Sequence, residues 1–266
     1  AQIPFSGAED YPTLRPLENP TVIRMKGSVL AEGINSTLYA TGDEELRPVL
    51  NGIYFDIDTE STTLVASNAN KLVYYRRHDI KSEAPVAFIL PKKPASLLKS
   101  ILAKETENVS IEFDNRVARF SLPEYRMVCR LIDGRYPNYN SVIPQNKPHK
   151  LTVDRAALIS TLRRVAIFSS QASLIKLHIE DNKVVISAQD TDFSTSAEES
   201  IACSYDGASM NIGFRASFLI DILNNTPGQD VVIELADPSR AGVIVPAEQV
   251  DKQELLMLLM PMMLTD

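Results

Sequence analysis

The 266-residue sequence has no tryptophan, two cysteines, three histidines and ten glycines. Cys129 and Cys203 are far apart and form no C-x-x-C pair, so they predict reduced thiols packed as small apolar side chains. The few glycines form neither G-x-G-x-x-G nor a Walker loop, which argues against a bound nucleotide. We therefore expect no metal site and no cofactor.

Long apolar runs are also missing. A helix that crosses a bilayer needs about 20 apolar residues, and neither such a run nor a signal peptide is visible. We expect a cytoplasmic protein with no membrane contact. The net charge of −7 should repel nucleic acid, so any DNA contact would need locally clustered Lys and Arg.

The sequence does contain an apolar C-terminal stretch, QELLMLLMPMMLTD, from Gln253 to Asp266. It is too apolar to be left in water and too short to span a membrane. We predict a last strand over Leu255–Leu259, ended by Pro261 because proline has no N–H to donate. Met262 and Leu264 then either line a groove for partners or lie buried under the sheet.

Two halves of the chain repeat one pattern. Ala84–Leu102 followed by Asn108–Phe113 matches Ala208–Leu223 followed by Asp230–Leu235, about 120 residues later. Each copy has a strand, a basic junction, an amphipathic helix and another strand. The repeat predicts an α+β fold made of two tandem copies, each with two helices packed on a curved antiparallel sheet.

The predicted helices have positive outer faces. Around Lys92–Leu102 the helical wheel puts Leu97, Leu98, Ile101 and Leu102 on the core side and the lysines outside. A solvated surface would explain one such face. Because both halves repeat the bias, it favours a shared surface for a phosphate backbone, and the lack of aromatic residues disfavours single-strand stacking.

Catalytic motifs are absent from the sequence. Asp190 and Asp192 could form a pair of acid–base carboxylates, but a turn between strands is favoured there, and His178 is expected on the solvent face of a strand. No H-E-x-x-H or nucleophile elbow is present. A hydrolase with an unrecognised site near Asp190 and an interaction scaffold that does not bind DNA remain as alternatives.

Several stretches resemble the bacterial DNA polymerase III beta subunit, the beta sliding clamp: LRPVLNGIYFDI (Leu46–Ile57), FILPKKPASLLKSIL (Phe88–Leu102), RLIDGRYPNYNSVIP (Arg130–Pro144) and LLMPMML (Leu258–Leu264). The resemblance implies a non-enzymatic processivity factor that encircles duplex DNA as a homodimeric ring of three-domain chains. It also implies that residues 1–19 are the tail of a missing first domain, with clamp domains at 20–145 and 146–266.

The resemblance also implies three sets of site residues. Partner motifs from the polymerase alpha subunit, the clamp loader delta subunit, other polymerases and mismatch repair proteins would enter a pocket formed by Leu50, Ser67, Ala69, Asn70, Lys71, Leu72, Pro137, Val142, Phe218, Leu258, Leu259, Met260, Pro261, Met262 and Leu264. The residues facing DNA would be Lys92, Lys99, Arg163, Arg164 and Arg215. The ring interface would use Ile167 and Phe168. Ser141 and Met263 stand where the family usually has Arg, which alters the rim of the pocket.

Overall fold

The computed structural model describes residues 2–4, 7, 9 and 16–264. Most of the predicted N-terminal tail, at positions 1, 5–6, 8 and 10–15, and the last two residues, 265–266, lie outside the described residues.

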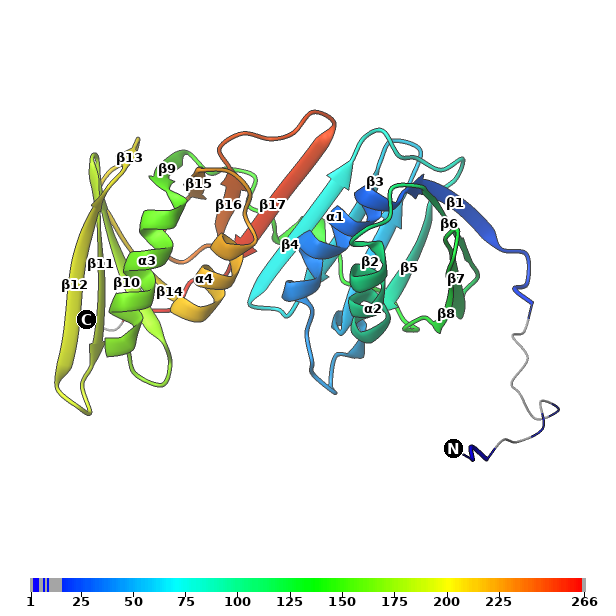
Figure 1. The fold of residues 1–266 in the computed structure, drawn as a ribbon. Coiled ribbons are helices and arrows are strands. Elements are labelled where there is room, and N and C mark those ends of the chain that lie inside the picture. Colours follow the sequence, from blue (N-terminus) through cyan, green and yellow to red (C-terminus); the bar gives the residue numbers. More distant parts are fainter. Residues whose placement is uncertain (1, 5–6, 8, 10–15, 265–266) are drawn as a thin grey trace.

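The chain forms two units with the same order of elements (Figure 1). The first unit contains β1 Thr21–Lys26, α1 Gly27–Thr37, η2 Leu38–Ala40, η3 Pro48–Leu50, β2 Gly52–Ile57, β3 Thr62–Ser67, β4 Lys71–Arg77, β5 Val86–Pro91, α2 Lys92–Leu102, β6 Asn108–Phe113, β7 Val117–Ser121 and β8 Arg126–Arg130. A connector with η4 Tyr139–Val142 follows. The second unit contains β9 His149–Asp154, α3 Arg155–Val165, η5 Ala166–Phe168, β10 Leu174–Glu180, β11 Lys183–Asp190, β12 Thr195–Ala202, β13 Ser204–Tyr205, β14 Met210–Arg215, α4 Ala216–Asn224, β15 Asp230–Leu235, β16 Gly242–Pro246 and β17 Gln253–Leu259.

Each unit has two four-stranded antiparallel layers. In the first unit these are β1-β6-β7-β8 and β5-β2-β3-β4, and in the second β9-β15-β16-β17 and β14-β10-β11-β12. Strands β4 and β17 pair, which fuses one layer from each unit into a nine-stranded sheet that also includes β13. The prediction of an α+β fold in two copies is confirmed. We expected one sheet in each copy, but each copy has two layers. The alternation of apolar and polar residues predicts strands, but it does not reveal which strands share a sheet.

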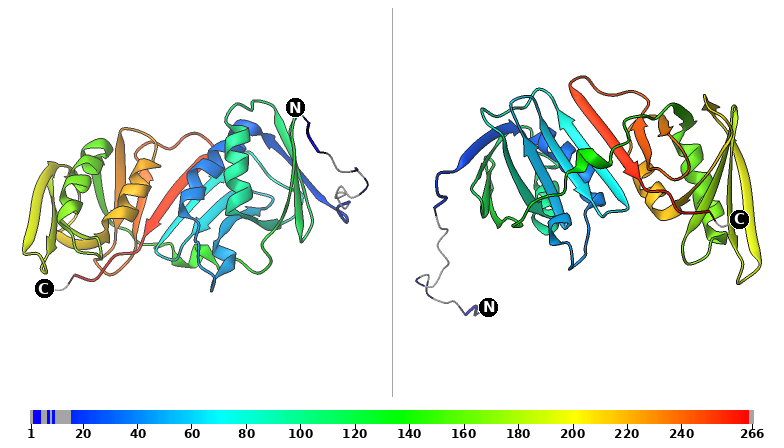
Figure 2. Two further views of the ribbon diagram at one scale, coloured as in Figure 1. Left: turned by 60° about the horizontal axis from the view of Figure 1, so that its bottom comes forward. Right: turned by 180° about the vertical axis from the view of Figure 1, so that it is seen from behind.

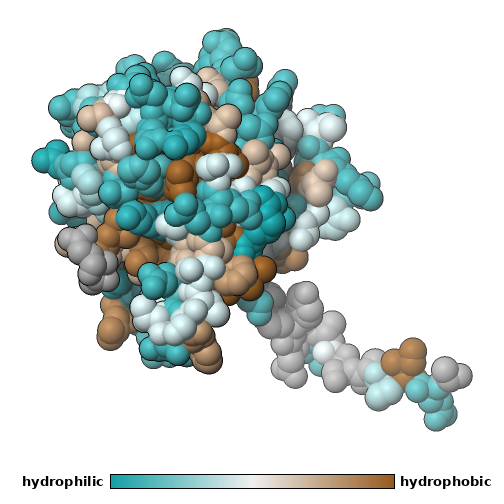
Figure 3. All heavy atoms as spheres, turned by 90° about the vertical axis from the view of Figure 1, so that its left-hand side faces the viewer, coloured by the Kyte–Doolittle hydropathy of each residue, from teal (hydrophilic) through white to brown (hydrophobic). Residues whose placement is uncertain are grey.

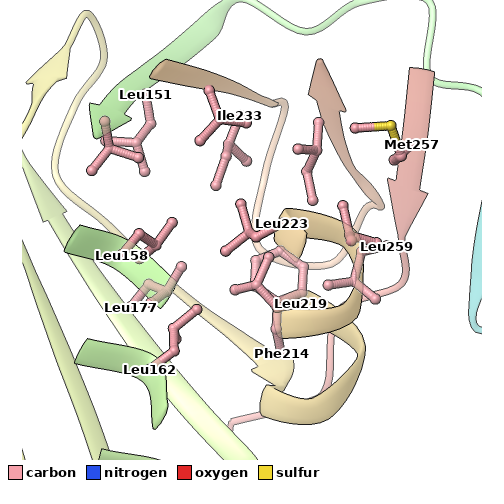
Figure 4. Packing of buried hydrophobic residues seen from close by; sticks show 14 of the residues in the cluster. Leu151, Leu158, Leu162, Leu177, Phe214, Leu219, Leu223, Ile233, Met257 and Leu259 are labelled. Carbon is pink, nitrogen blue, oxygen red and sulfur yellow. The ribbon is translucent and has the colours of Figure 1, made fainter. Parts of the chain in front are cut away.

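The helices lie together on one side of the nine-stranded sheet, in the order α3, α4, α1, α2 across the molecule (Figures 1 and 2). In the second unit, α3 and α4 pack their Leu side chains against strands of both layers (Figure 4). The first unit repeats this packing with α1 and α2. The connector crosses the opposite face of the sheet, which has its own apolar cluster and is called the outer face below (Figure 2).

The helical wheel was wrong for Leu97. Ala95, Leu98 and Leu102 are the buried residues of α2, whereas Leu97 is 53% exposed. Spacing assigned Leu97 to the edge of the apolar stripe, and the strands do not reach that far around the helix. In α3 the buried residues recur at helical spacing: Leu158, Ile159, Thr161, Leu162 and Val165.

Candidate functional site

The two units meet where β4 pairs with β17. Seven residue pairs join them, from Gln253 opposite Arg77 to Leu259 opposite Lys71. The pairing extends one residue further, because Met260 N–H donates to the Asn70 carbonyl at 2.9 Å. The pairing therefore ends just before Pro261. This agrees with the prediction, because proline has no main-chain N–H to donate to the neighbouring strand. Side chains along both strands alternate between the helix side and the outer face.

The outer face of the join has an apolar surface. Leu50, Leu72 and Leu258, from η3, β4 and β17, are buried in one cluster with residues of the connector. Beside them, Val142 is 51% exposed and Met260 is 43% exposed. Three of the predicted pocket residues thus form a buried floor on this face, and the connector and the end of β17 add the accessible apolar side chains of Val142 and Met260.

A hairpin loop with several internal hydrogen bonds joins β3 to β4 beside Met260. The Ser67 hydroxyl donates to the Lys71 carbonyl and accepts from Ala69 N–H, and the Asn68 side chain accepts from the main-chain N–H groups of Asn70 and Lys71. Ala69 has a φ of 71°, a conformation that costs energy for a residue with a side chain. The loop is held in place by its own polar groups. Pro137, in the connector, is exposed.

Lys71 points to the helix side, away from the outer face. Its amine lies 2.9 Å from Asp221 of α4 and about 5 Å above the rings of Tyr39 and Phe218 (5.0 and 5.1 Å), and its side chain is only 4% exposed. Leu259 also packs on this side. The predicted pocket set is therefore divided between two faces: the side chains of Lys71, Phe218 and Leu259 support the join from behind.

The C-terminal segment lies along β14 of the second unit. Met262 N–H donates to the Gly213 carbonyl at 2.8 Å, and the two residues form an isolated β-bridge. Leu264 also packs on Gly213, so closely that an added Cβ would lie 2.8 Å from it. These contacts place the tail on β14, and the groove shared by Met262 and Leu264 with Leu72 stays a prediction. Both side chains are half-buried, and the main chain of Met260 contacts Asn70 at the join.

The five predicted DNA-facing residues occupy different environments. Lys92 is paired with Asp43, and Arg164 makes a bidentate pair with Glu199. Arg163 donates to the Asn224 side chain at 3.3 Å, and Lys99 is exposed. The Arg215 guanidinium lies over the Phe218 ring, 5.2 Å from its centre, and so belongs to the join.

Ile167 and Phe168 are 77% and 39% exposed on η5, at the end of the molecule formed by β12, where apolar patches reach the surface (Figure 3). The equivalent 3-10 helix of the first unit is η2, in which Tyr39 corresponds to Ile167 and Ala40 to Phe168. Those residues pack against the second unit at the join. Ile167 and Phe168 hold the corresponding place at a free end.

Sequence reasoning missed Asp221, whose role depends on a lysine 150 residues away, and Tyr139, whose ring packs under the outer face while its hydroxyl donates to Asp56. The sequence around Tyr136 and Tyr139 does not show that these two rings pack on the outer face of the sheet. Asp190 accepts from the N–H groups of Asp192 and Phe193, so the turn reading is confirmed there.

Within residues 2–4, 7, 9 and 16–264, no three His, Cys, Asp or Glu side chains are grouped as a metal site would require. None of the helices in that part of the chain combines the length and apolar character needed to cross a membrane.

Two family models match the chain: DNA polymerase III beta subunit, central domain, over residues 24–138, and its C-terminal domain over residues 140–262. The chain belongs to the DNA polymerase III beta subunit family. The beta sliding clamp of Vibrio cholerae is 24% identical over 258 residues, covering 97% of this chain and 69% of the relative. The clamp fold is confirmed by a sliding clamp from Pseudomonas aeruginosa, with a TM-score of 0.91, 25% identity and coverage of 97% and 69%. A clamp from Bartonella birtlesii gives a TM-score of 0.89, 29% identity and coverage of 96% and 69%. Sliding clamps are accessory subunits of a polymerase.

Proposed function

We propose that this chain is the motif-binding and DNA-facing part of a sliding clamp that holds a replicative polymerase on duplex DNA in the cytoplasm. The observation that carries the proposal is the apolar outer face at the join, built from both units, with the Asn68–Asn70 loop beside Met260. We take the domain limits to be 20–145 and 146–266, so that the join falls between them.

The partners at this face are proteins with a short linear motif of a Gln, two Leu-type residues and a Phe. We infer that the polymerase alpha subunit, the clamp loader delta subunit, other polymerases and mismatch repair proteins present such motifs. Leu50, Leu72 and Leu258 supply a preformed apolar floor, which lowers the ordering cost of binding. Met260 is unbranched and can adapt to different side chains.

A ring requires a contact at the free end of the second unit. The internal join supports this proposal, because η2 of the first unit packs against its neighbour and η5 holds the same place with Ile167 and Phe168 exposed. In the full-length homodimer these two residues would pack against the next chain. An interface of this kind needs exposed apolar side chains at its centre.

A peptide titration tests the motif site. A fluorescent peptide carrying the motif should bind the chain, and Met260→Ala should weaken binding about tenfold, the loss expected for one apolar contact of about 1.4 kcal/mol. Leu97→Ala is the matched control, because Leu97 is a 53% exposed apolar side chain on α2, on the helix side of the sheet. Equal affinity of both variants and the unchanged chain would refute the assignment of this face.

A further inference from the structure

The four helices differ in charge: the two outer ones are basic and the two central ones are acidic. α1 has one charged residue, Glu32, and α4 has one, Asp221. The other two helices are purely basic: α2 carries Lys92, Lys93 and Lys99, and α3 carries Arg155, Arg163 and Arg164. Because the spatial order is α3, α4, α1, α2, the two basic helices are the outer ones and the two acidic helices flank the join (Figures 1 and 2).

The contrast between α1 and α3 arises at equivalent positions. Both helices have 11 residues and follow equivalent strands, and their buried residues fall at the same places along the helix. Where α3 exposes Arg163 and Arg164, α1 has Asn35 and Ser36. The first unit thus has the same scaffold without the two cations.

The surface beside α1 is also hollow. A cavity of about 520 Å³ is lined by Glu32 and Asn35 of α1, by Lys104 and Glu105 after α2, and by Asn225 after α4. The Lys71 amine near α4 is nearly buried and paired with Asp221, so it is not free to bind a phosphate. The centre of the helix row therefore combines a recess with two helices that carry no basic side chain.

We propose that duplex DNA is held at two separate basic stripes, α2 and α3, and that the join between them makes no phosphate contact. This inference rests on the proposed function. Phosphates are bound where cations displace counterions from the duplex. Over α1 and α4 the duplex keeps its counterions and water, because neither helix carries a basic side chain and the recess keeps the surface away from the duplex.

The test is the salt dependence of binding to a short fluorescent duplex, measured on the whole chain. Each phosphate contact contributes about 0.9 to the slope of log K against log salt concentration, so Lys99→Ala and Arg163→Ala should each reduce the slope by about 0.9. Lys104→Ala is the matched control. It removes the same charge at the cavity and should leave the slope unchanged. Binding of the motif peptide by every variant verifies that the fold is intact.

Two results would overturn the proposal: Lys104→Ala reducing the slope as much as Lys99→Ala, or unchanged slopes for both Lys99→Ala and Arg163→Ala. If the unsubstituted chain bound the peptide but not the duplex, the DNA part of the proposed function would fail as well. That outcome differs from the first two, in which the chain still binds DNA but the contacts are not divided between α2 and α3.

Discussion

β4 and β12 occupy the same place in the two units, but only β4 has a strand on both sides. The registers of the two sheets align Tyr74 with Glu198 and Tyr75 with Glu199. β4 is buried over its first five residues and pairs with β17, whereas β12 is the terminal strand of its sheet and no more than half-buried at any residue. The two strands have equivalent positions in the fold, so their side chains decide that β4 and not β12 pairs with the other unit.

The acidic edge of β12 also limits wrong pairing. Exposed strand edges invite association, and charged side chains on an edge reduce it. Another terminal strand, β8, has Arg126 and Arg130 at its ends. Like charges therefore oppose pairing of two β12 edges or of two β8 edges from different copies.

The largest effect should come from making β4 resemble β12. Tyr74 is 4% exposed in the outer-face cluster and its hydroxyl donates to Glu254. Tyr74→Glu removes the ring and puts a second carboxylate beside Glu254, so it should lower the free energy of unfolding by about 4 kcal/mol. Urea denaturation measures this loss.

The control for that substitution is the reverse change on β12. Glu198 is exposed, so Glu198→Tyr should change the free energy of unfolding by no more than about 0.5 kcal/mol. Comparable losses in the two variants would mean that β4 and β12 are not distinguished by burial at the join.

The sequence predicted what repeats locally and missed what links the units. The strand predicted over Leu255–Leu259 and the helix predicted around Lys92–Leu102 depend on nearby residues, and the structure confirms them. Pairing of β4 with β17 joins residues about 180 apart, and no periodic pattern encodes a partner. For the same reason Lys71 was assigned to the pocket from its position in the chain, although its side chain points to the opposite face.

The ion pair at the join comes next in expected effect. The equivalent of Lys71 on β12 is Thr195, and no such pair exists there within the described residues. Asp221→Asn leaves a nearly buried amine without its carboxylate. We expect a loss of about 2 kcal/mol, below the usual cost for a buried pair because the Asp221 side chain is 52% exposed.

A double variant separates the ion pair from packing. Lys71→Met keeps the contacts with Tyr39 and Phe218 and removes the charge, so Lys71→Met combined with Asp221→Asn should be more stable than Asp221→Asn alone. Strictly additive losses, measured by urea denaturation, would show that the two residues are not coupled.

The segments after β8 and β17 provide a third comparison. After β8, the Ile132 N–H donates to the Ile89 carbonyl on β5. After β17, the Met262 N–H donates in the same way to the Gly213 carbonyl on β14, so only the second contact involves a glycine. Gly213→Ala would place a Cβ 2.8 Å from the Met262 carbonyl oxygen. Because the tail can shift, we expect a loss of only about 1 kcal/mol, with faster proteolysis after Leu259. An unchanged cleavage rate would argue against close packing of the tail on β14.

The smallest effect concerns the cysteines near the two terminal strands. Burial raises the pKa of the Cys129 thiol, on β8, to about 11, and burial also raises the pKa of Cys203, which follows β12. At pH 8 a thiol with a pKa near 11 is ionised in about one molecule in a thousand. Since thiolate is the reactive form, Cys129 should react with Ellman's reagent more slowly than an unfolded chain does, and its rate should rise about tenfold per pH unit.

The pH dependence of stability follows from the same shift. Above pH of about 8.5 the thiol loses its proton more readily in the unfolded chain, so the folded state should lose stability as the pH rises toward 11. Cys203→Ala leaves Cys129 as the one cysteine that can be labelled. Labelling of Cys129 at the rate of an unfolded thiol at pH 8 would show that this edge strand opens freely, in contrast to the strands at the join.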